Sequence, residues 1–248
     1  MDLHQKNVKI VAIIQARMGS TRLPGKVLID LAGDTVLARV VSRTRRAKSL
    51  NEIVVATSVL PADDVIVREC ERLGVACYRG DEADVLDRYY QAAQQFAANI
   101  VVRITSDCPL IDPEVTERTI RAFREKNPDY ASNTIVRTYP RGLDTEVMSL
   151  TALARAWGEA RKPYEREHVT PYLVEHPSEF VLLSVTGDDD YSQCRWTLDT
   201  PQDYEFVQAV YEQLGAEALF SWRDVLDLLD LVPNLSELNR CVSQKPIH

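Results

Sequence analysis

The sequence predicts an α/β domain with a mostly parallel β-sheet and helices on both of its faces. Three short runs rich in β-branched residues alternate with longer segments in which apolar residues recur every three to four positions. The short runs are almost entirely apolar, which is typical of strands buried on both faces. Strands and helices that alternate in this way form parallel sheets, and ligands bind at the carboxyl ends of such strands.

The elements follow one another in a regular order over the first half of the chain. Strands are expected at 8–14, 52–57 and 99–105, and helices at 35–47, 62–73 and 83–97. A fourth helix is expected at 113–126, because Pro113 follows Asp112 and proline is favoured at the first position of a helix. After a looser stretch, strands are expected at 180–185 and 194–199, and helices at 201–213 and 221–230.

Length, composition and charge favour a single domain spanning residues 1–248. The chain has a formal net charge of −8 and is 45% hydrophobic, which is enough for one full core. Within it, the loose region 134–178 is expected to be an insertion or lid and 237–248 a mobile tail. No nucleic-acid partner is expected, because phosphate-backbone binding needs a concentrated basic face and this chain is acidic.

The cysteines and the amino-terminal stretch indicate the compartment. The five cysteines are scattered and form no C-x-x-C pair, so we expect reduced thiols rather than disulfides or a structural zinc site. The stretch MDLHQKN is polar and no long apolar run follows it, so neither a signal peptide nor a membrane span is expected. The sequence therefore predicts a cytoplasmic protein with no membrane partner.

A basic segment follows the first predicted strand, and we call residues 16–26 the basic loop. Residues 13–26, IIQARMGSTRLPGK, include two glycines, a proline and three basic residues, Arg17, Arg22 and Lys26. A glycine-rich turn after a buried strand lets backbone N–H groups approach phosphate oxygens while basic side chains neutralise their charge. It is not a P-loop, because five residues separate Gly19 from Gly25 and Val27 replaces the magnesium-binding Ser or Thr. A solvated basic loop without a ligand is the alternative.

Two aspartates are candidates for a metal site. Asp107 follows the strand predicted at 99–105 and Asp199 follows the next apolar run, so both lie at strand ends that can face one site. Magnesium prefers one or two carboxylates with waters and phosphate oxygens, so a phosphate ligand bound at the basic loop could complete such a site. Each aspartate also precedes a proline by two residues, so a helix N-cap is the alternative role for either.

The basic loop closely resembles the amino-terminal signature of the cytidylyltransferases that make CMP-activated acidic sugars. The residues that carry this resemblance are Gln15-Ala16-Arg17-Met18-Gly19-Ser20-Thr21-Arg22-Leu23-Pro24-Gly25-Lys26. It continues through VVATS, YRGDEADVLDRYYQAA, RITSDCPLIDP, GLDTEV, REHVTPY and WTLDTPQDYEFV, over roughly residues 8–215. The nearest group comprises the spore-coat polysaccharide and acylneuraminate cytidylyltransferase-like proteins. The resemblance implies a three-layer α/β/α nucleotide-diphospho-sugar transferase fold of the GT-A type.

The resemblance also implies how CTP and metal are bound. It places Arg17 and Lys26 on the phosphates, and Asp107 and Asp199 on Mg²⁺. Cys108 stands where some relatives carry an acidic residue, so one or two ions remain open. The other residues expected on CTP are Gln15, Ala16, Gly19, Ser20, Arg22, Arg79 and Arg88. Asp84 and Asp87 either join them or begin a helix and pair with Arg88.

The acceptor site is assigned by elimination to the looser region. Its candidate residues are Arg141, Asp144, Glu146, Arg166 and His168. Arginine forks suit a substrate carboxylate and acidic side chains suit sugar hydroxyls, so the mixture fits an acidic or polyhydroxylated sugar. A structural hydrogen-bonding role for His168 and a solvated helix face for Arg166 are the alternatives. By resemblance, residues 134–176 are also the candidate homodimer interface.

These observations favour transfer of CMP from CTP to an acidic or related sugar, with release of pyrophosphate, for surface polysaccharide. One alternative is an enzyme of the same fold that uses another nucleotide or acceptor, or a glycosyltransferase. The other is a non-catalytic nucleotide-binding module, which would bind nucleotide but release no pyrophosphate.

Overall fold

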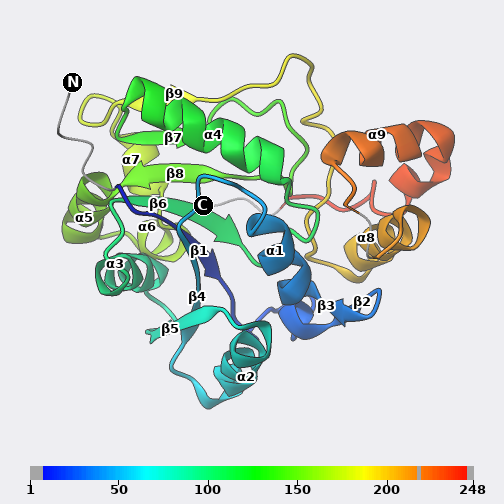
Figure 1. Ribbon diagram of the computed structural model, residues 1–248, viewed down its shortest axis with the longest axis horizontal. Helices are drawn as coiled ribbons and strands as arrows, with labels where there is room; N and C mark the ends of the chain where they lie inside the picture. Colours follow the sequence, from blue (N-terminus) through cyan, green and yellow to red (C-terminus); the bar gives the residue numbers. More distant parts are fainter. Residues whose placement is uncertain (1–7, 217–218, 245–248) are drawn as a thin grey trace.

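The computed structural model describes residues 8–216 and 219–244, and within them a seven-stranded β-sheet forms the centre of the molecule (Figure 1). In chain order its strands are β1 (Ile10–Gln15), β4 (Glu52–Ser58), β5 (Ala76–Gly80), β6 (Ile100–Thr105), β7 (Tyr130–Ser132), β8 (Glu146–Ser149) and β9 (Leu182–Ser184). Their spatial order is β5-β4-β1-β6-β8-β7-β9, and among these strands β8 alone is antiparallel to its neighbours. The predicted α/β class with a mostly parallel sheet is confirmed.

The order of the strands explains where a ligand can bind. β1 pairs in parallel with β4 on one side and with β6 on the other. The chain first builds the sheet outward from β1 through β4 and β5, and then crosses to β6 on the opposite side. At such a switch point the connections leave the strand ends in opposite directions, which opens a crevice at the carboxyl ends of β1 and β6.

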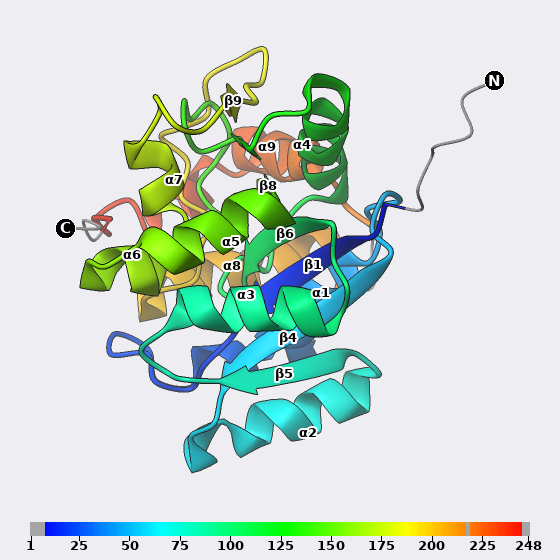
Figure 2. The same cartoon turned by 90° about the vertical axis from the view of Figure 1, so that its left-hand side faces the viewer.

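Helices cover both faces of the sheet and complete three layers (Figures 1 and 2). One face is covered by α1 (Val36–Thr44), α2 (Asp64–Leu73) and α4 (Pro113–Lys126). The other is covered by α3 (Val85–Gln95), α5 (Leu150–Glu159), α6 (Pro163–His168) and α7 (Pro171–Glu175). In β1, Ala12 and Ile14 pack toward the first group and Val11 and Ile13 toward the second, and all four are fully buried. β1 is therefore buried on both faces, as its composition predicts.

A third apolar core lies beside the sheet. Its elements are α8 (Pro201–Leu214), α9 (Trp222–Leu231) and the hairpin of β2 (Asp30–Leu31) and β3 (Asp34–Thr35). Short 3-10 helices are η1 (Lys26–Leu28), η2 (Pro61–Asp63) and η3 (Pro233–Glu237). Trp196 is 1% exposed in this core and Leu198 is fully buried, so the segment that leads to Asp199 is held firmly.

Capping residues explain where two predicted helices begin. Asp112 accepts hydrogen bonds from two backbone N–H groups in the first turn of α4, and Pro113 occupies the next position. At α8, Thr200 and Asp203 form a reciprocal capping box around Pro201. Both helix starts were predicted from the prolines, and both are confirmed.

The strand predicted at 194–199 is wrong. These residues are extended but make only an isolated bridge, between Arg141 and Arg195. Their backbone groups bond instead to two loops: Trp196 N donates to Arg141 O at 2.7 Å, and Leu198 N to Asp107 O at 2.8 Å. Loops and strands offer the same hydrogen-bonding groups, so the apolar pattern alone does not separate the two cases.

The region expected to be an insertion, 134–178, contributes to the central layers. It supplies β8, which lies inside the sheet between β6 and β7, and α5, which covers one face. The tail expected to be mobile from residue 237 is also ordered in part, because Asn239 is 4% exposed and its amide donates two hydrogen bonds. Residues 245–248 of that tail lie outside the described residues.

Replacing Gly142 by alanine is expected to destabilise the protein by roughly 2–5 kcal/mol. Gly142 has φ +111°, and a Cβ there would lie 2.6 Å from the backbone of Trp196. Backbone cannot move aside as a flexible side chain can, so strain and overlap add. Urea unfolding measures the effect. Gly158→Ala, in α5 with open space at its Cβ, is the control and should not destabilise; equal effects of the two changes would contradict the prediction.

Candidate active site

An open cleft of about 1220 Å³ lies at the carboxyl ends of β1 and β6. Its walls come from the basic loop, the turn after β6, residues of 134–146 and residues of 167–175. In Figure 2 the parallel strands point to the left, toward the side on which α6 and the red C-terminal segment lie. The cleft therefore occupies the position that the strand order predicts for a ligand.

The basic loop has a fixed shape that directs its last residue inward. Met18 N donates to Asp63 Oδ1 at 2.8 Å, and Gly25 N donates to Met18 O at 3.1 Å, so the loop folds back on itself. Gly25 has φ +69°, a left-handed conformation that glycine adopts without strain. Lys26 follows directly in η1, and its side chain is 11% exposed.

Lys26 joins the two predicted metal-binding aspartates. Its ammonium nitrogen, Nζ, lies 2.8 Å from Asp107 Oδ2 and 2.8 Å from Asp199 Oδ1. It also donates to the backbone oxygen of Leu198 at 2.9 Å. Residues separated by 81 and 173 positions in the chain thus form one Lys26–Asp107–Asp199 cluster on the cleft wall.

Lys26 and Asp107 each favour the ionised form of the other. Burial lowers the pKa of the Lys26 ammonium, but the charges of Asp107 and Asp199 outweigh it and leave that pKa raised. Burial likewise raises the pKa of the Asp107 carboxyl, but Lys26 and a hydrogen bond from Thr105 outweigh it and lower the pKa to about 2. The Asp107 carboxylate is therefore ionised at neutral pH and can serve as a cation ligand.

The cluster fits a divalent cation that is shared with phosphates. Two carboxylate oxygens, one after β6 and one after an extended segment, converge on one positive atom, Lys26 Nζ, and a Mg²⁺ site with phosphate ligands uses one or two carboxylates. No group of three or more His, Cys, Asp or Glu residues that could hold a metal occurs among residues 8–216 and 219–244. The remaining ligands of such an ion would therefore come from the nucleotide and water.

Two arginines balance the charge of Asp199. Its other carboxylate oxygen, Oδ2, lies 2.9 Å from an Arg22 nitrogen and 3.0 Å from Arg195 Nη2. The Arg22 side chain is 36% exposed, whereas that of Arg195 is 10% exposed. Arg22 is thus free to reach a bound anion, and Arg195 is fixed.

Most residues expected on the nucleotide lie in the cleft wall. These are Gln15, Ala16, Arg17, Gly19, Ser20, Arg22 and Arg88. Arg17 lies at the rim with 41% of its side chain exposed, and its contacts with Glu82 and Glu167 are long, 3.7 and 3.6 Å. Ion pairs this exposed contribute little, so Arg17 can exchange them for a phosphate at small cost.

Arg88 is a buried cation on the cleft wall that pairs with no carboxylate in the described chain. It is 2% exposed, its Nε has no hydrogen-bond partner among these residues, and its other nitrogens reach only backbone oxygens, at 3.5 Å. Burial lowers its pKa. The suggested pairing with Asp84 or Asp87 is wrong, because Asp84 caps α3 and binds Arg166, and Asp87 accepts from Trp157. Arg88 is therefore available to an anionic or carbonyl oxygen.

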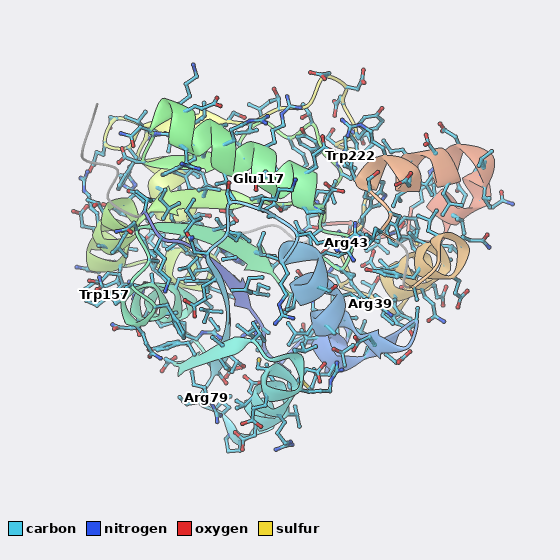
Figure 3. All side chains as sticks on the ribbon, in the orientation of Figure 1. Arg39, Arg43, Arg79, Glu117, Trp157 and Trp222 are labelled. Carbon is cyan, nitrogen blue, oxygen red and sulfur yellow. The ribbon has the colours of Figure 1, made fainter. Side chains whose placement is uncertain are left out.

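Arg79 does not line the cleft, so the structure does not bring it together with the other residues predicted to bind CTP. Its guanidinium bonds to Asp64 at 2.7 Å and to the backbone oxygens of Ser58 and Leu60. Figure 3 shows it beside α2 at the lower edge of the view. Side chains alternate between the two faces of a strand, and in β5 this alternation turns Arg79 toward α2.

On the acceptor side, Arg141, Asp144, Glu146 and His168 line the cleft. Asp144 accepts from both terminal nitrogens of Arg137, at 2.6 and 2.8 Å. Glu146 binds Arg103 and accepts from Tyr130 Oη at 2.6 Å. These carboxylates are thus already paired.

Arg141 differs from its neighbours, because its guanidinium has no ion pair among the described residues, whereas Arg103 and Arg137 each bind a carboxylate. Burial lowers the pKa of Arg141, and the nearby charge of Arg137 lowers it further.

Arg166, by contrast, does not line the cleft. It binds both oxygens of Asp84 and the backbone oxygen of Trp157, and the contact with Asp84 joins α6 to the start of α3. The structure therefore does not bring Arg166 together with the other residues predicted to bind the acceptor.

Several cleft residues were missed from the sequence. They are Arg103, Thr105, Tyr130, Arg137, Glu167 and Gln244. Arg103 did carry a signal, because a charged residue inside the buried strand NIVVRIT needs a buried partner. Gln244 carried none, because its place in the cleft depends on how the C-terminal segment folds back.

Comparison with known proteins identifies the family. The family model described as cytidylyltransferase matches residues 11–224, which include every residue of the Lys26–Asp107–Asp199 cluster. The chain belongs to the cytidylyltransferase family. A solved cytidylyltransferase from Leptospira borgpetersenii serovar Hardjo-bovis superposes with a TM-score of 0.89 at 33% identity, over 96% of this chain and 100% of that one.

Two named relatives extend the comparison of this cytidylyltransferase. The spore coat polysaccharide biosynthesis protein SpsF of Bacillus subtilis is 34% identical, over 91% of this chain and 95% of its own. The 3-deoxy-manno-octulosonate cytidylyltransferase of Anaeromyxobacter dehalogenans is 43% identical, over 81% of this chain and 97% of its own. In the described part of our chain, no helix is both long and apolar enough to span a membrane.

Proposed function

We propose that this cytidylyltransferase transfers CMP from CTP to a sugar that carries a carboxylate, with release of pyrophosphate. The observation that carries the proposal is the Lys26–Asp107–Asp199 cluster, which joins the last residue of the basic loop to two carboxylates on the wall of one cleft. In a member of this family, a site that joins phosphate-binding groups to two carboxylates supports nucleotidyl transfer. The name of the Anaeromyxobacter relative, which acts on a sugar acid, supports the acceptor class.

The nucleotide half of the cleft would bind the triphosphate. Arg17 and Arg22, both partly exposed, would donate to phosphate oxygens together with backbone N–H groups near Gly19. The Lys26 ammonium lies between the two aspartates. Phosphate oxygens bound in the cleft would become its third anionic partner. Arg88 would donate to an oxygen of the base or sugar, because no carboxylate in the described chain pairs with it.

Asp107 and Asp199 would hold a divalent cation, which we propose to be Mg²⁺. Bound there, the ion would polarise the α-phosphate and neutralise charge on the departing pyrophosphate. The protein residues orient the two carboxylates and supply positive charge around the reacting phosphorus. Two carboxylates without a third protein ligand favour a single ion fixed by the protein.

The acceptor half would place the sugar hydroxyl opposite the leaving pyrophosphate. Arg141 would pair with the substrate carboxylate, and the oxygens of Asp144 and Glu146 would accept from sugar hydroxyls. The attacking hydroxyl oxygen would bond to the α-phosphorus and release its proton to solvent water, while the bond from this phosphorus to the bridging oxygen breaks and its electron pair leaves with pyrophosphate. Supply of an activated sugar for surface polysaccharide would follow, as the name of the Bacillus relative suggests. Dimerisation through 134–176 and a cytoplasmic location stay predictions.

Binding of CTP can be tested before the sugar is known. Thermal unfolding is measured with MgCl₂ and, separately, CTP, UTP, ATP or GTP. A nucleotide at about 100 times its dissociation constant adds about 2.7 kcal/mol, which raises the midpoint of a domain of this size by about 5–11 °C. We expect CTP to give this shift and the other nucleotides a smaller one. A larger shift with another nucleotide would revise the donor, and no shift with any would contradict the proposal.

A further inference from the structure

Arg195 connects Asp199 to Asp203 and to Gln244 near the end of the described chain. Every nitrogen of its guanidinium has a side-chain partner: Nε donates to Asp203 at 2.8 Å, Nη2 to Asp203 and Asp199 at 3.0 Å each, and Nη1 to Gln244 at 2.6 Å. The side chain is 10% exposed. A guanidinium bound on every side in this way has one orientation, which an exposed arginine does not have.

Asp203 holds both Arg195 and the backbone of Asp199. It is fully buried in the first turn of α8, and its Oδ2 accepts from Asp199 N at 3.1 Å and from Thr200 N at 3.0 Å. Its Oδ1 accepts from Arg195 and from Asn239 Nδ2 at 3.0 Å. One carboxylate therefore fixes the main chain of Asp199 and the arginine that binds its side chain.

The C-terminal segment closes this arrangement. Asn239 Nδ2 also donates to the backbone oxygen of Arg195 at 2.9 Å, and Gln244 Oε1 accepts from its Nη1. Both residues follow α9 and η3 and lie beyond residue 224, where the match to the family model ends. In Figure 2 this red segment lies on the same side as the strand ends. We call Asp203, Asn239 and Gln244 the Arg195 clamp.

The two carboxylate oxygens of Asp199 have different partners. Oδ2 faces Arg195 and Arg22, which leaves Oδ1 directed to Lys26 beside Asp107. Without Arg195 the carboxylate would keep only Arg22 on Oδ2, from a side chain that is 36% exposed and free to follow a phosphate. The Asp199 carboxylate could then rotate away from Asp107.

The geometry points to Arg195 as a positioning residue that, held by the Arg195 clamp, keeps Asp199 Oδ1 aimed at the cation position beside Asp107. This inference rests on the proposed function, because it gives Asp199 the role of a metal ligand. It adds that the C-terminal segment helps to arrange the metal site through the partners that it supplies to Arg195. Groups that orient metal ligands typically contribute about 10- to 100-fold in metal affinity or activity.

Mn²⁺ binding tests the inference without turnover. Electron paramagnetic resonance measures free Mn²⁺ as it is titrated into the full chain with saturating α,β-methylene-CTP, a CTP analogue that cannot be cleaved. For Arg195→Lys, which keeps the charge but not the fork, we expect Mn²⁺ affinity about 10- to 100-fold below that of the wild type. Affinity for the analogue without metal should change less than about threefold, because Arg195 is not placed on the nucleotide. Arg240→Ala, in the same segment with its side chain 75% exposed, is the matched control.

The outcomes separate the inference from the proposed function. If Arg195→Lys binds Mn²⁺ like the wild type while Asp199→Asn does not, the positioning role is overturned. If the wild type takes up no Mn²⁺ with the analogue, the metal site of the proposed function fails instead. Should Arg195→Lys not fold, Gln244→Ala decides, because it removes a single partner at the edge of the clamp. A weaker affinity in Gln244→Ala supports the clamp, and wild-type affinity overturns it.

Discussion

Replacing Asp107 by asparagine is expected to lower the rate of CMP transfer by about 1000-fold or more. The change keeps the shape of the side chain but removes one of the two charges that face Lys26 at 2.8 Å. A metal ion that polarises a phosphoryl oxygen supplies several kcal/mol, and each 1.36 kcal/mol lost is about tenfold in rate. Single-turnover measurement of CMP-sugar formation at saturating CTP gives the rate.

Asp189→Asn is the matched control for this change. It removes the same charge from an exposed residue that does not line the cleft, so its rate should equal that of the wild type. Melting curves of both variants show whether each is folded. A folded Asp107→Asn protein with a rate within about tenfold of the wild type would contradict the metal-binding role of Asp107.

Replacing Lys26 by methionine is expected to lower the rate by about 100- to 1000-fold, the usual effect of losing one preorganised charge contact to a developing anion. Methionine keeps the length and apolar stem of the side chain but has no ammonium group. Steady-state kinetics with CTP give the rate. An unchanged rate would mean that the basic loop does not act on the phosphates, whatever its position in the cleft.

The same variant has a second expected effect, on stability as a function of pH. In the wild type, the pKa of Asp107 is about 2 against its usual 3.8, which contributes about 2 kcal/mol above pH 4 and is lost as the pH falls toward 2. In Lys26→Met, burial raises this pKa, so protonation at acid pH relieves the variant. Its loss of unfolding free energy should be largest near pH 7 and shrink below pH 4. A constant difference across this range would contradict the pairing.

Predictions from the sequence succeeded where short-range pattern decides the structure. The buried run at β1 and the proline starts of α4 and α8 each reflect a local preference that the fold keeps. The candidate site was found largely through the resemblance of the basic loop. Asp107 follows β6 as predicted, whereas Asp199 follows an extended segment that is not a strand and that lies beside Asp107 through the hydrogen bond from Leu198 N to Asp107 O.

The predicted site residues that do not line the cleft have partners that are distant in the sequence or on another face of the sheet. Arg166 was assigned to the acceptor, but its partner Asp84 lies 82 positions earlier and joins two helices. The prediction for Arg79 lacked its register in β5, which turns the side chain away from the cleft and toward Asp64. A charged residue in a motif predicts an interaction partner, but the identity of that partner depends on the fold. Gln244 is the opposite case: no sequence pattern marked it, yet the fold brings it to Arg195, 49 positions away.

Formation of a CMP-sugar is the most direct test of the proposed transfer. The wild type is incubated with MgCl₂, CTP and a panel of sugar acids that begins with 3-deoxy-manno-octulosonate, and ³¹P NMR follows both products. We expect pyrophosphate and a CMP-sugar diester in equal amounts with at least one acid, and neither product with Asp107→Asn. Tight binding of CTP without pyrophosphate from any acid, or transfer that requires another nucleotide, would contradict this function.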